Sequence, residues 1–199
     1  MVIVFLLPME NEVLKVISTR RTVKPEDMNG KQIDHDLFFQ IIQAANWAPT
    51  HGLTEPWRLV IYKGEQLKDF SYWHAELYKA NTPETQFLEK KYTTILKRTI
   101  NTSHLVVVYM KRGQNKNIPI LEEICATSCA IQNMLLAAQS LGVASYWGTG
   151  GMTYHAAFKQ ALNLDKEDMV LGQLFFGYSD VLPEAKRNSG IETKIKYKR

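Results

Sequence analysis

Apolar residues recur along the chain with a helical period in some stretches and as short continuous runs in others. This alternation predicts a mixed protein of helices and strands. In the first helical stretch, Val13, Leu14 and Ile17 fall on one face, while Asp34 and Asn117 stand at candidate N-cap positions of two others. Helices are expected over residues 10–18, 35–47, 64–80, 83–100, 118–141 and 154–164.

Runs rich in β-branched and aromatic residues predict four strands, over residues 57–62, 104–110, 141–151 and 169–178. The third strand runs into a glycine-rich turn, and the run HLVVVYM is typical of a strand buried on both faces. The helices come in pairs, which favours an α+β three-layer sandwich at least as much as a doubly wound sheet. No repeat or low-complexity stretch interrupts the chain, so one domain is expected over residues 1–199, with a tail from Ser179 that lacks an apolar face.

Composition is that of an ordinary globular protein, with 199 residues, 45% hydrophobic and 22% charged. The net charge is +4, and the terminal KIKYKR supplies much of it. A basic tail leaves nucleic-acid binding open as a weaker alternative. We expect no nucleic-acid partner and no membrane.

Two cysteines, Cys125 and Cys129, lie four residues apart on the predicted long helix. We expect both to be small buried apolar residues, and their number is typical of a reducing compartment. The N-terminal MVIVFLLP is too short to span a membrane and lacks the charged start and cleavage site of a signal peptide. A cytoplasmic location is therefore expected, with Met1 or Met9 as the biological start.

The common catalytic motifs are missing from the sequence. WGTGG lacks the third glycine of the dinucleotide fingerprint, and there is no phosphate-binding G-x-x-x-x-G-K-[ST] loop, no H-E-x-x-H and no G-x-S-x-G. The five histidines are scattered, so no metal site is predicted.

Four separated segments remain, each combining loop backbone with polar or cationic residues. They are RRTVK (20–24), APTHGLTEPW (48–57), LGVASYWGTG (141–150) and PEAKR (183–187). Arginines beside a hydroxyl and a further cation are suited to binding a phosphate ester, although cations at a helix C-terminus also complement the helix dipole. The alternative for the glycine-rich segment 141–150 is a plain tight turn. The alternative for His51, in the segment 48–57, is a loop histidine in water.

In their order and spacing these segments resemble the nitroreductase family of FMN-dependent oxidoreductases, over nearly the whole chain. The A-P-T-H form is most similar to a subgroup with a histidine in this loop. The resemblance implies a homodimer with FMN at the subunit interface, a mostly antiparallel sheet, and a C-terminal tail that reaches the partner subunit. It also implies that a hydride passes from NADH or NADPH through flavin N5 to a small acceptor in two half-reactions. A nitroaromatic, quinone or enone would serve as the acceptor.

The resemblance further implies roles for individual residues, none of them catalytic in the strict sense because the cofactor supplies the chemistry. The phosphate would be bound by Arg20 and Arg187, with Arg21 and Thr22 adding backbone and hydroxyl contacts. Lys24 would lie near the flavin pyrimidine. The partner subunit would supply Thr50 and His51, and backbone amides would come from Trp147, Gly148 and Thr149.

Two positions depart from the family pattern. Leu53 stands where the pattern has an asparagine, and Glu55 stands where it has a glutamine. Leu53 cannot hydrogen-bond a flavin, and Glu55 would place a negative charge near the ring unless it pairs with a cation such as Arg58. These departures leave a flavin-less dimeric binding protein open as an alternative. Residues 64–100 are the one candidate for a lid over the site.

Overall fold

The structure, a computed structural model, describes residues 11–198. The expectations for MVIVFLLP and for Met1 or Met9 as the start lie outside these residues. The strands are β1 (Trp57–Lys63), β2 (His104–Met110), β3 (Ala144–Gly148) and β4 (Met169–Gly177). The helices are α1 (Glu12–Thr19), α2 (His35–Gln43), α3 (Glu65–Ala80), α4 (Glu89–Leu96), α5 (Ile120–Ser140) and α6 (Ala156–Ala161).

The four strands form one sheet in the order β1-β2-β4-β3, and every neighbouring pair is antiparallel. The central strand β2 pairs Val106 with Ile61 of β1 and with Leu174 of β4. Strand β3 lies at one edge of the sheet, and this edge borders the candidate site described below.

Side chains alternate across the central strands and so build two cores. Val106 and Val108 of β2 pack with α2 and α5, whereas Leu105 and Val107 pack on the opposite face with α3 and α6. All four side chains are fully buried, as the continuous apolar run predicts.

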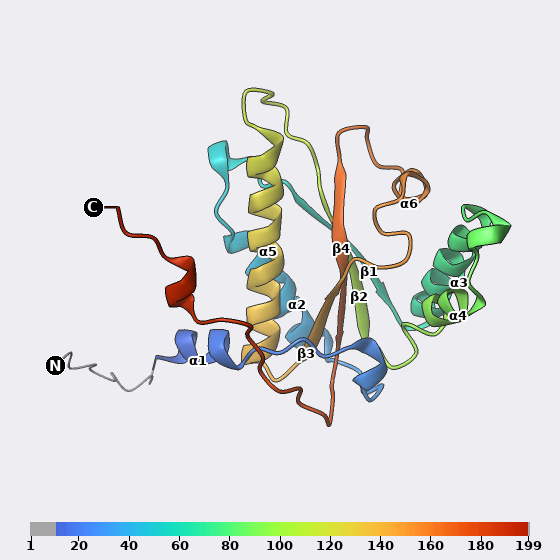
Figure 1. The fold of residues 1–199 in the computed structure, drawn as a ribbon, viewed down its shortest axis with the longest axis horizontal. Coiled ribbons are helices and arrows are strands. Elements are labelled where there is room, and N and C mark those ends of the chain that lie inside the picture. The colour runs from blue at the N-terminus through green and yellow to red at the C-terminus, as the bar shows by residue number, and fades with distance from the viewer. Residues whose placement is uncertain (1–10, 199) are drawn as a thin grey trace.

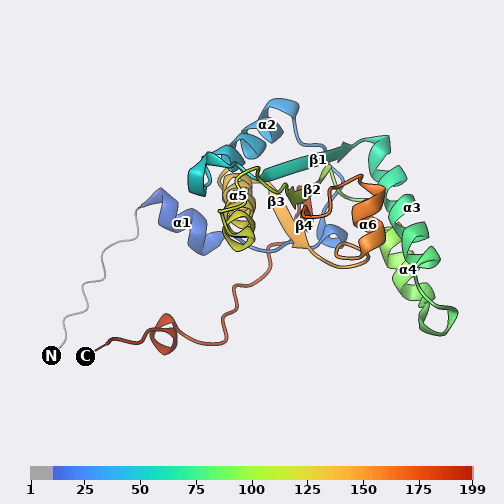
Figure 2. The ribbon, with the colours of Figure 1, turned by 90° about the horizontal axis from the view of Figure 1, so that it is seen from above.

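The helices cover both faces of the sheet, with α1, α2 and α5 on one side and α3, α4 and α6 on the other (Figures 1 and 2). This arrangement confirms the expected three-layer α+β sandwich with an antiparallel sheet. The predicted order of helices and strands is confirmed as well.

Helix α5 is long and apolar enough to cross a membrane by length and composition alone. In the structure it packs along the sheet, and its side chains Ala130, Ile131 and Met134 are fully buried in the core. Its apolar composition is therefore accounted for in part by core packing. The remaining apolar side chains, such as Leu121, are exposed on this chain alone.

Three local predictions were wrong. Helix α5 begins at Ile120 with Pro119 at the N-cap rather than Asn117, because a residue before proline disfavours helical backbone and excludes Ile118. The single helix expected over 83–100 is a short turn followed by α4, since Phe87 adopts extended backbone and packs its ring between two tyrosines.

Cys125 is the third error. It is exposed on the surface of α5 rather than buried, and Cys129 is only partly buried; both are free thiols. Cys125 follows Glu122 by three residues, so both lie on the face of α5 that points away from the sheet. The apolar residues of this helix are spread evenly around it, so the sequence pattern did not reveal which face is exposed.

The segment after β4 leaves the body of the protein and runs on the same side as α1 (Figures 1 and 2). The Ser179 hydroxyl donates to the Asp27 carbonyl at 2.6 Å and anchors its start. Beyond Ser179, every described residue except the half-buried Pro183 is exposed, including Leu182 at 73% and Tyr197 at 85%. The tail has no core face within this chain, as predicted.

Candidate active site

The segment after α1 lies along the free edge of β3. Helix α1 ends at Thr19, and the chain then extends so that the Val23 amide donates to the Ser145 carbonyl at 3.0 Å. Gln139, near the C-terminal end of α5, donates to the Thr19 hydroxyl at 3.5 Å. The segment 20–24 is thereby fixed beside both β3 and the end of α5.

Three arginines gather at this edge. Desolvation by burial lowers the pKa of Arg20, and the neighbouring positive charges of Arg187 and Arg21 lower it further. Arg187 therefore approaches Arg20 from the C-terminal tail. Among residues 11–198, no carboxylate forms an ion pair with any of the three.

Arg21 adds an orphaned polar atom to this cluster. Its Nη1 donates to the Ser18 and Arg20 carbonyls at 2.8 and 3.0 Å, but its Nε is buried without a described partner. The side chain of Thr22 is exposed beside it. Converging cations without a counter-charge favour an anion with several acceptor oxygens, such as a phosphate ester.

The opposite end of β3 runs into the predicted glycine-rich turn. The Trp147 indole donates to the Leu171 carbonyl at 3.0 Å, which fixes the last residues of the strand. Gly148 is buried, while Thr149 and Gly150 are exposed. The amides of Thr149 and Gly150 donate to no acceptor within residues 11–198. These amides are available to a bound molecule, as a turn that presents backbone to a ligand requires.

A buried histidine anchors this turn from α3. The Met152 amide donates to His74 Nε2 at 2.8 Å, so the ring must accept there and is neutral. Gly151 lies against the same ring with φ +70°, and a Cβ at this position would approach Nε2 to 2.5 Å. The Thr153 hydroxyl donates to the Gly150 carbonyl at 2.6 Å, which closes the turn.

We expect His74 to make the protein acid-sensitive. Burial, followed by the charges of Arg98 and Lys91, lowers its pKa to about 4. Because the pKa in the fold lies below the unfolded value of about 6.5, the stabilisation is complete above pH 6.5 and is lost as pH falls toward 4. The free energy of unfolding should drop by about 2 kcal/mol from this group between pH 7 and pH 4.5.

Urea unfolding at both pH values tests this expectation. His104, whose pKa burial also lowers to about 4, loses stability in the same window and serves as the background. His74→Gln retains a neutral acceptor for the Met152 amide. The variant should lose less unfolding free energy between pH 7 and pH 4.5 than the parent protein, by the roughly 2 kcal/mol assigned to His74. An identical pH dependence in the variant and the parent protein would contradict the assignment.

Lys24 faces a cleft of about 830 Å³ between the start of β3 and α4. Its Nζ lies 3.7 Å from the Glu26 carboxylate, and both side chains are largely exposed. Tyr146 forms part of the cleft wall, so Lys24 and strand β3 share one open space.

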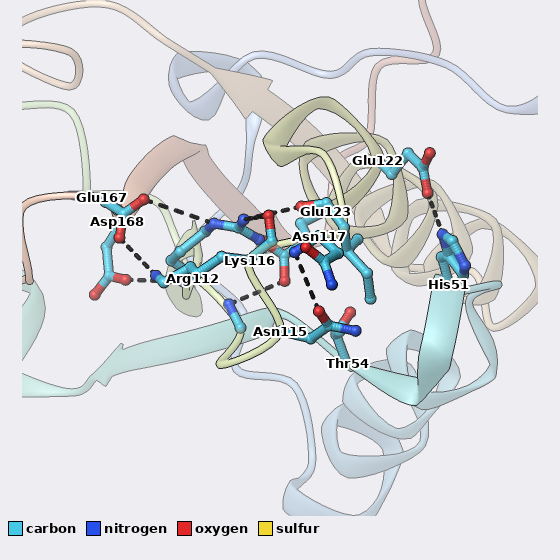
Figure 3. A network of polar contacts seen from close by, with 12 residues as sticks. His51, Thr54, Arg112, Asn115, Lys116, Asn117, Glu122, Glu123, Glu167 and Asp168 are labelled. Carbon is cyan, nitrogen blue, oxygen red and sulfur yellow. Dashed lines mark hydrogen bonds and ion pairs between the residues drawn. The ribbon is translucent and has the colours of Figure 1, made fainter.

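The loop that holds Thr50 and His51 lies at the other end of α5 (Figures 1 and 3). His51 Nδ1 lies 2.5 Å from the Glu122 carboxylate in the first turn of α5, and Thr50 hydrogen-bonds Thr54 at 3.0 Å. Glu122 and Gln139 are 17 positions apart on one helix, which at 1.5 Å per residue is about 26 Å. Within one chain, therefore, His51 and the arginine cluster lie at opposite ends of α5 and do not form one site.

The two departures from the family pattern lie at strained backbone positions. Leu53 has φ +52° and Glu55 has φ +41°, in the left-handed region that asparagine tolerates better than other non-glycine residues. Leu53 is 81% exposed. Arg58 donates to the Glu55 backbone carbonyl at 2.7 Å and makes no ion pair with its carboxylate. The charge of Glu55 is thus not neutralised by Arg58.

A buried ion pair, which sequence reasoning missed, holds this loop in place (Figure 3). Arg112 Nη1 donates to Glu123 at 2.5 Å, with side-chain exposures of 6% and 1%. The other Glu123 oxygen accepts from the Gly113 amide at 2.9 Å, and Arg112 Nη2 donates to the Ile118 carbonyl at 2.9 Å. Thr54 packs against Gly113, so the pair supports the loop 50–55 from beneath.

The structure brings together Arg20, Arg21, Arg187 and the segment through Thr22 and Lys24 along one edge of β3. The C-terminal end of the same strand holds Trp147 and Gly148, and Thr149 follows directly. Thr50 and His51 are not part of this arrangement in a single chain. The geometry defines an α+β sandwich protein with a cationic sheet edge suited to a phosphorylated ligand.

The chain belongs to the nitroreductase family, whose model matches residues 17–178. A solved nitroreductase-like protein of Bacillus cereus is 29% identical, covers 93% of this chain and 95% of its own, and superposes with a TM-score of 0.79. YfhC of Bacillus subtilis, provisionally named an NAD(P)H nitroreductase, is 24% identical over 181 residues, 90% of this chain and 91% of its own. A nitroreductase of Bacteroides fragilis solved with FMN is 24% identical with a TM-score of 0.68, covering 95% and 100%.

Proposed function

We propose that the protein is an FMN-dependent oxidoreductase that uses NADH or NADPH to reduce a small acceptor such as a nitroaromatic, quinone or enone. The observation that carries the proposal is the arginine cluster at the edge of β3, with its unpaired guanidinium groups and the orphaned Arg21 Nε. Family membership and the FMN bound to the Bacteroides fragilis nitroreductase support the choice of cofactor.

The residues fit the two ends of FMN. Arg20, Arg21 and Arg187 would hold the phosphate, with the Thr22 hydroxyl beside it. The free amides of Thr149 and Gly150, next to Trp147 and Gly148, would face acceptor atoms of the ring. Lys24 would lie near the pyrimidine, where a cation stabilises the negative charge of a reduced ring. The chemistry that bound FMN would supply is the transfer of a hydride equivalent from the nicotinamide to the acceptor.

We propose that the working protein is a homodimer with the site at its interface. The α5 residues Glu122 and Gln139, which contact the His51 loop and the arginine segment, lie about 26 Å apart. A two-fold axis across antiparallel α5 helices would bring the His51 loop of one chain to the arginine cluster of the other. Thr50 and His51 would then come from the partner subunit. Exposed apolar side chains on the same side support an interface; they include Leu14, Ile17, Trp47, Leu121, Leu182 and Ile195.

The exposed tail fits the same dimer, because its apolar residues find no partner within this chain. Deletion of residues 182–199 should shift the protein from dimer toward monomer at micromolar concentration, measured by sedimentation velocity. The charge variant Lys196→Gln is the matched control and should remain dimeric. A fully dimeric truncated chain would argue against a tail that reaches the partner subunit.

The free thiols of Cys125 and Cys129 support a cytoplasmic location, where such thiols remain reduced. Anaerobic addition of NADH or NADPH to the flavin-loaded protein tests the proposed function directly. Bleaching of the flavin absorbance is expected.

The flavin-less binding protein is the second candidate, since Leu53 and Glu55 remove two polar contacts that the family pattern would supply. It predicts a dimer that takes up no FMN. A test for FMN uptake by the purified protein separates the two candidates.

A further inference from the structure

A second cavity, of about 420 Å³, lies at the end of the sheet where β1 stops and β2 begins. Its wall is polar and carries no residue assigned to the flavin. The residues that matter for its chemistry are His35, Lys63, Gly64, Gln66 and His104. They come from the start of α2, the end of β1, the start of α3 and the first position of β2.

This cavity is separated from the flavin site by the sheet itself. The His104 ring stacks on Phe38 of α2, with the two ring centres 3.8 Å apart. Tyr146, in the wall of the cleft that Lys24 faces, instead packs on Phe175 in the core beneath α3. Because α2 and α3 cover opposite faces of the sheet (Figure 2), the two cavities are distinct.

A buried histidine turns an unpartnered donor into this cavity. His104 is only 5% exposed, and its Nδ1 lies 2.9 Å from the Ser103 hydroxyl. That hydroxyl already accepts from the Ile33 amide at 2.8 Å, so its own proton is available to Nδ1; the other acceptor, Gln32 Oε1, is farther away at 3.5 Å. The ring proton therefore sits on Nε2, which has no hydrogen-bond partner among residues 11–198.

Helix α3 begins at the same cavity with free backbone amides. Its N-cap is Gly64, at φ +57°, which has no side chain to cap the helix. The amides of Gly64, Glu65 and Gln66 donate to no acceptor in the described part of the chain. Free amides at the start of a helix carry the positive end of its dipole and favour an anion.

Two cationic side chains border the same donors. Burial, followed by the charges of Lys63 and His35, lowers the pKa of His104 to about 4, so these two side chains lie close to a ring that is neutral at pH 7. Lys63 forms no ion pair with a carboxylate of residues 11–198. Its positive charge is therefore available to a ligand.

The carboxylates nearest in sequence are occupied elsewhere. Glu65 pairs with Lys68 at 3.2 Å on the surface of α3, and Asp34 accepts from two amides in the first turn of α2. The Gln66 side-chain oxygen accepts from the Lys63 amide at 3.4 Å. The cavity thus combines several free donors with few free acceptors.

We propose that this cavity is a second anion site, which binds the phosphate group of a small ligand between His104 Nε2, Lys63 and the free amides at the start of α3. A phosphate has enough acceptor oxygens to use all three kinds of donor at once. The cavity volume is typical of sites for small organic molecules, so a phosphate monoester fits it better than free phosphate. The site is independent of the flavin and adds a second ligand to the protein.

The test is a ¹H–¹⁵N NMR titration of the FMN-loaded protein with inorganic phosphate, glycerol 3-phosphate and neutral glycerol. FMN occupies the arginine cluster, so the Gly64, Glu65 and Gln66 amides report on the second site alone. If the protein takes up no flavin, Arg20→Ala weakens phosphate binding at the arginine cluster for the same titration.

Both phosphate compounds should shift these three amide resonances in a saturable manner, and glycerol should not. Tighter binding of glycerol 3-phosphate assigns the site to a monoester, and equal affinities assign it to free phosphate. The absence of saturable shifts at the start of α3 would overturn the proposal.

Two variants test the donors separately. His104→Phe keeps the stacking on Phe38 but removes Nε2, and it should weaken phosphate binding about 10-fold. Lys63→Gln changes an exposed side chain and should fold normally, with a loss of about 3-fold because water screens this charge. Lys79→Gln, an exposed change near the other end of α3, is the matched control and should keep the parent affinity. Unchanged affinity in both His104→Phe and Lys63→Gln would overturn the proposal.

Discussion

Glu123→Ala is expected to lower the free energy of unfolding by about 3–5 kcal/mol, the cost of breaking a buried ion pair by removing one partner. The variant leaves the Arg112 guanidinium buried at 6% exposure and removes the acceptor of the Gly113 amide. Glu167 compensates only in part, because it lies 3.7 Å from Arg112 Nε, is half exposed and already pairs with Lys116 at 2.6 Å. Urea unfolding followed by tryptophan fluorescence measures the loss.

The neighbouring Glu122→Ala is the matched control for this prediction. Glu122 also has a side-chain partner, the His51 ring, but both side chains are exposed, so the change should cost at most about 1 kcal/mol. If Glu123→Ala fails to fold, Glu123→Gln keeps the volume and an acceptor oxygen and serves as a milder variant. Equal losses for the Glu122 and Glu123 variants would show that burial does not govern the strength of this pair.

Arg20→Ala is expected to weaken FMN binding by about 10- to 100-fold, because it removes charge-assisted hydrogen bonds to the phosphate. Riboflavin lacks the phosphate, so its affinity should fall much less. Titration of each flavin with protein, followed by quenching of flavin fluorescence, gives both values. Lys79→Ala, at an exposed cation on α3, is the control.

The dimer should persist in Arg20→Ala, since the contact proposed for this side chain is with the ligand and not with the α5 core. Unchanged affinity for FMN would remove Arg20 from the site. Equal losses for FMN and riboflavin would instead indicate that Arg20 supports the fold of the sheet edge and not the phosphate.

Much of the fold could be predicted because the hydrophobic pattern of this chain is consistent with its structure. The run HLVVVYM has no polar alternation, and β2 is buried on both faces. Asp34 accepts from the Asp36 and Leu37 amides at the start of α2, as its N-cap position predicts. Local signals of this kind depend on neighbouring residues and can be read from the sequence.

The errors arose where longer-range packing overrides local preference. Phe87 leaves helical backbone to pack against Tyr78, a partner nine residues away on α3. Asn163, at φ +54°, ends α6 before the expected residue 164. The first outcome does not follow from periodicity, because the contact between Phe87 and Tyr78 cannot be read from the sequence. The second is a local effect of an asparagine with left-handed backbone, which periodicity does not include.

The site could be predicted only as a set of segments. Sequence reasoning found the arginine segment and the glycine-rich turn, but it missed His74, Arg98 and the Arg112–Glu123 pair. His74 did carry a signal, since it shares the buried face of α3 with Leu67, Phe70 and Tyr78 at helical spacing. Arg98 carried none, because its stacking on Tyr146 joins residues that are far apart in the chain.

The most direct test of the account is the visible absorbance spectrum of the purified protein, recorded before and after anaerobic addition of NADH and then NADPH. We predict flavin absorbance in the visible region after loading with FMN, at one flavin per chain, and bleaching of that absorbance by at least one of the two nucleotides. A protein that stays colourless after incubation with FMN would contradict the central claim and favour the flavin-less dimer. A bound flavin that neither nucleotide reduces would contradict the proposed reductase activity.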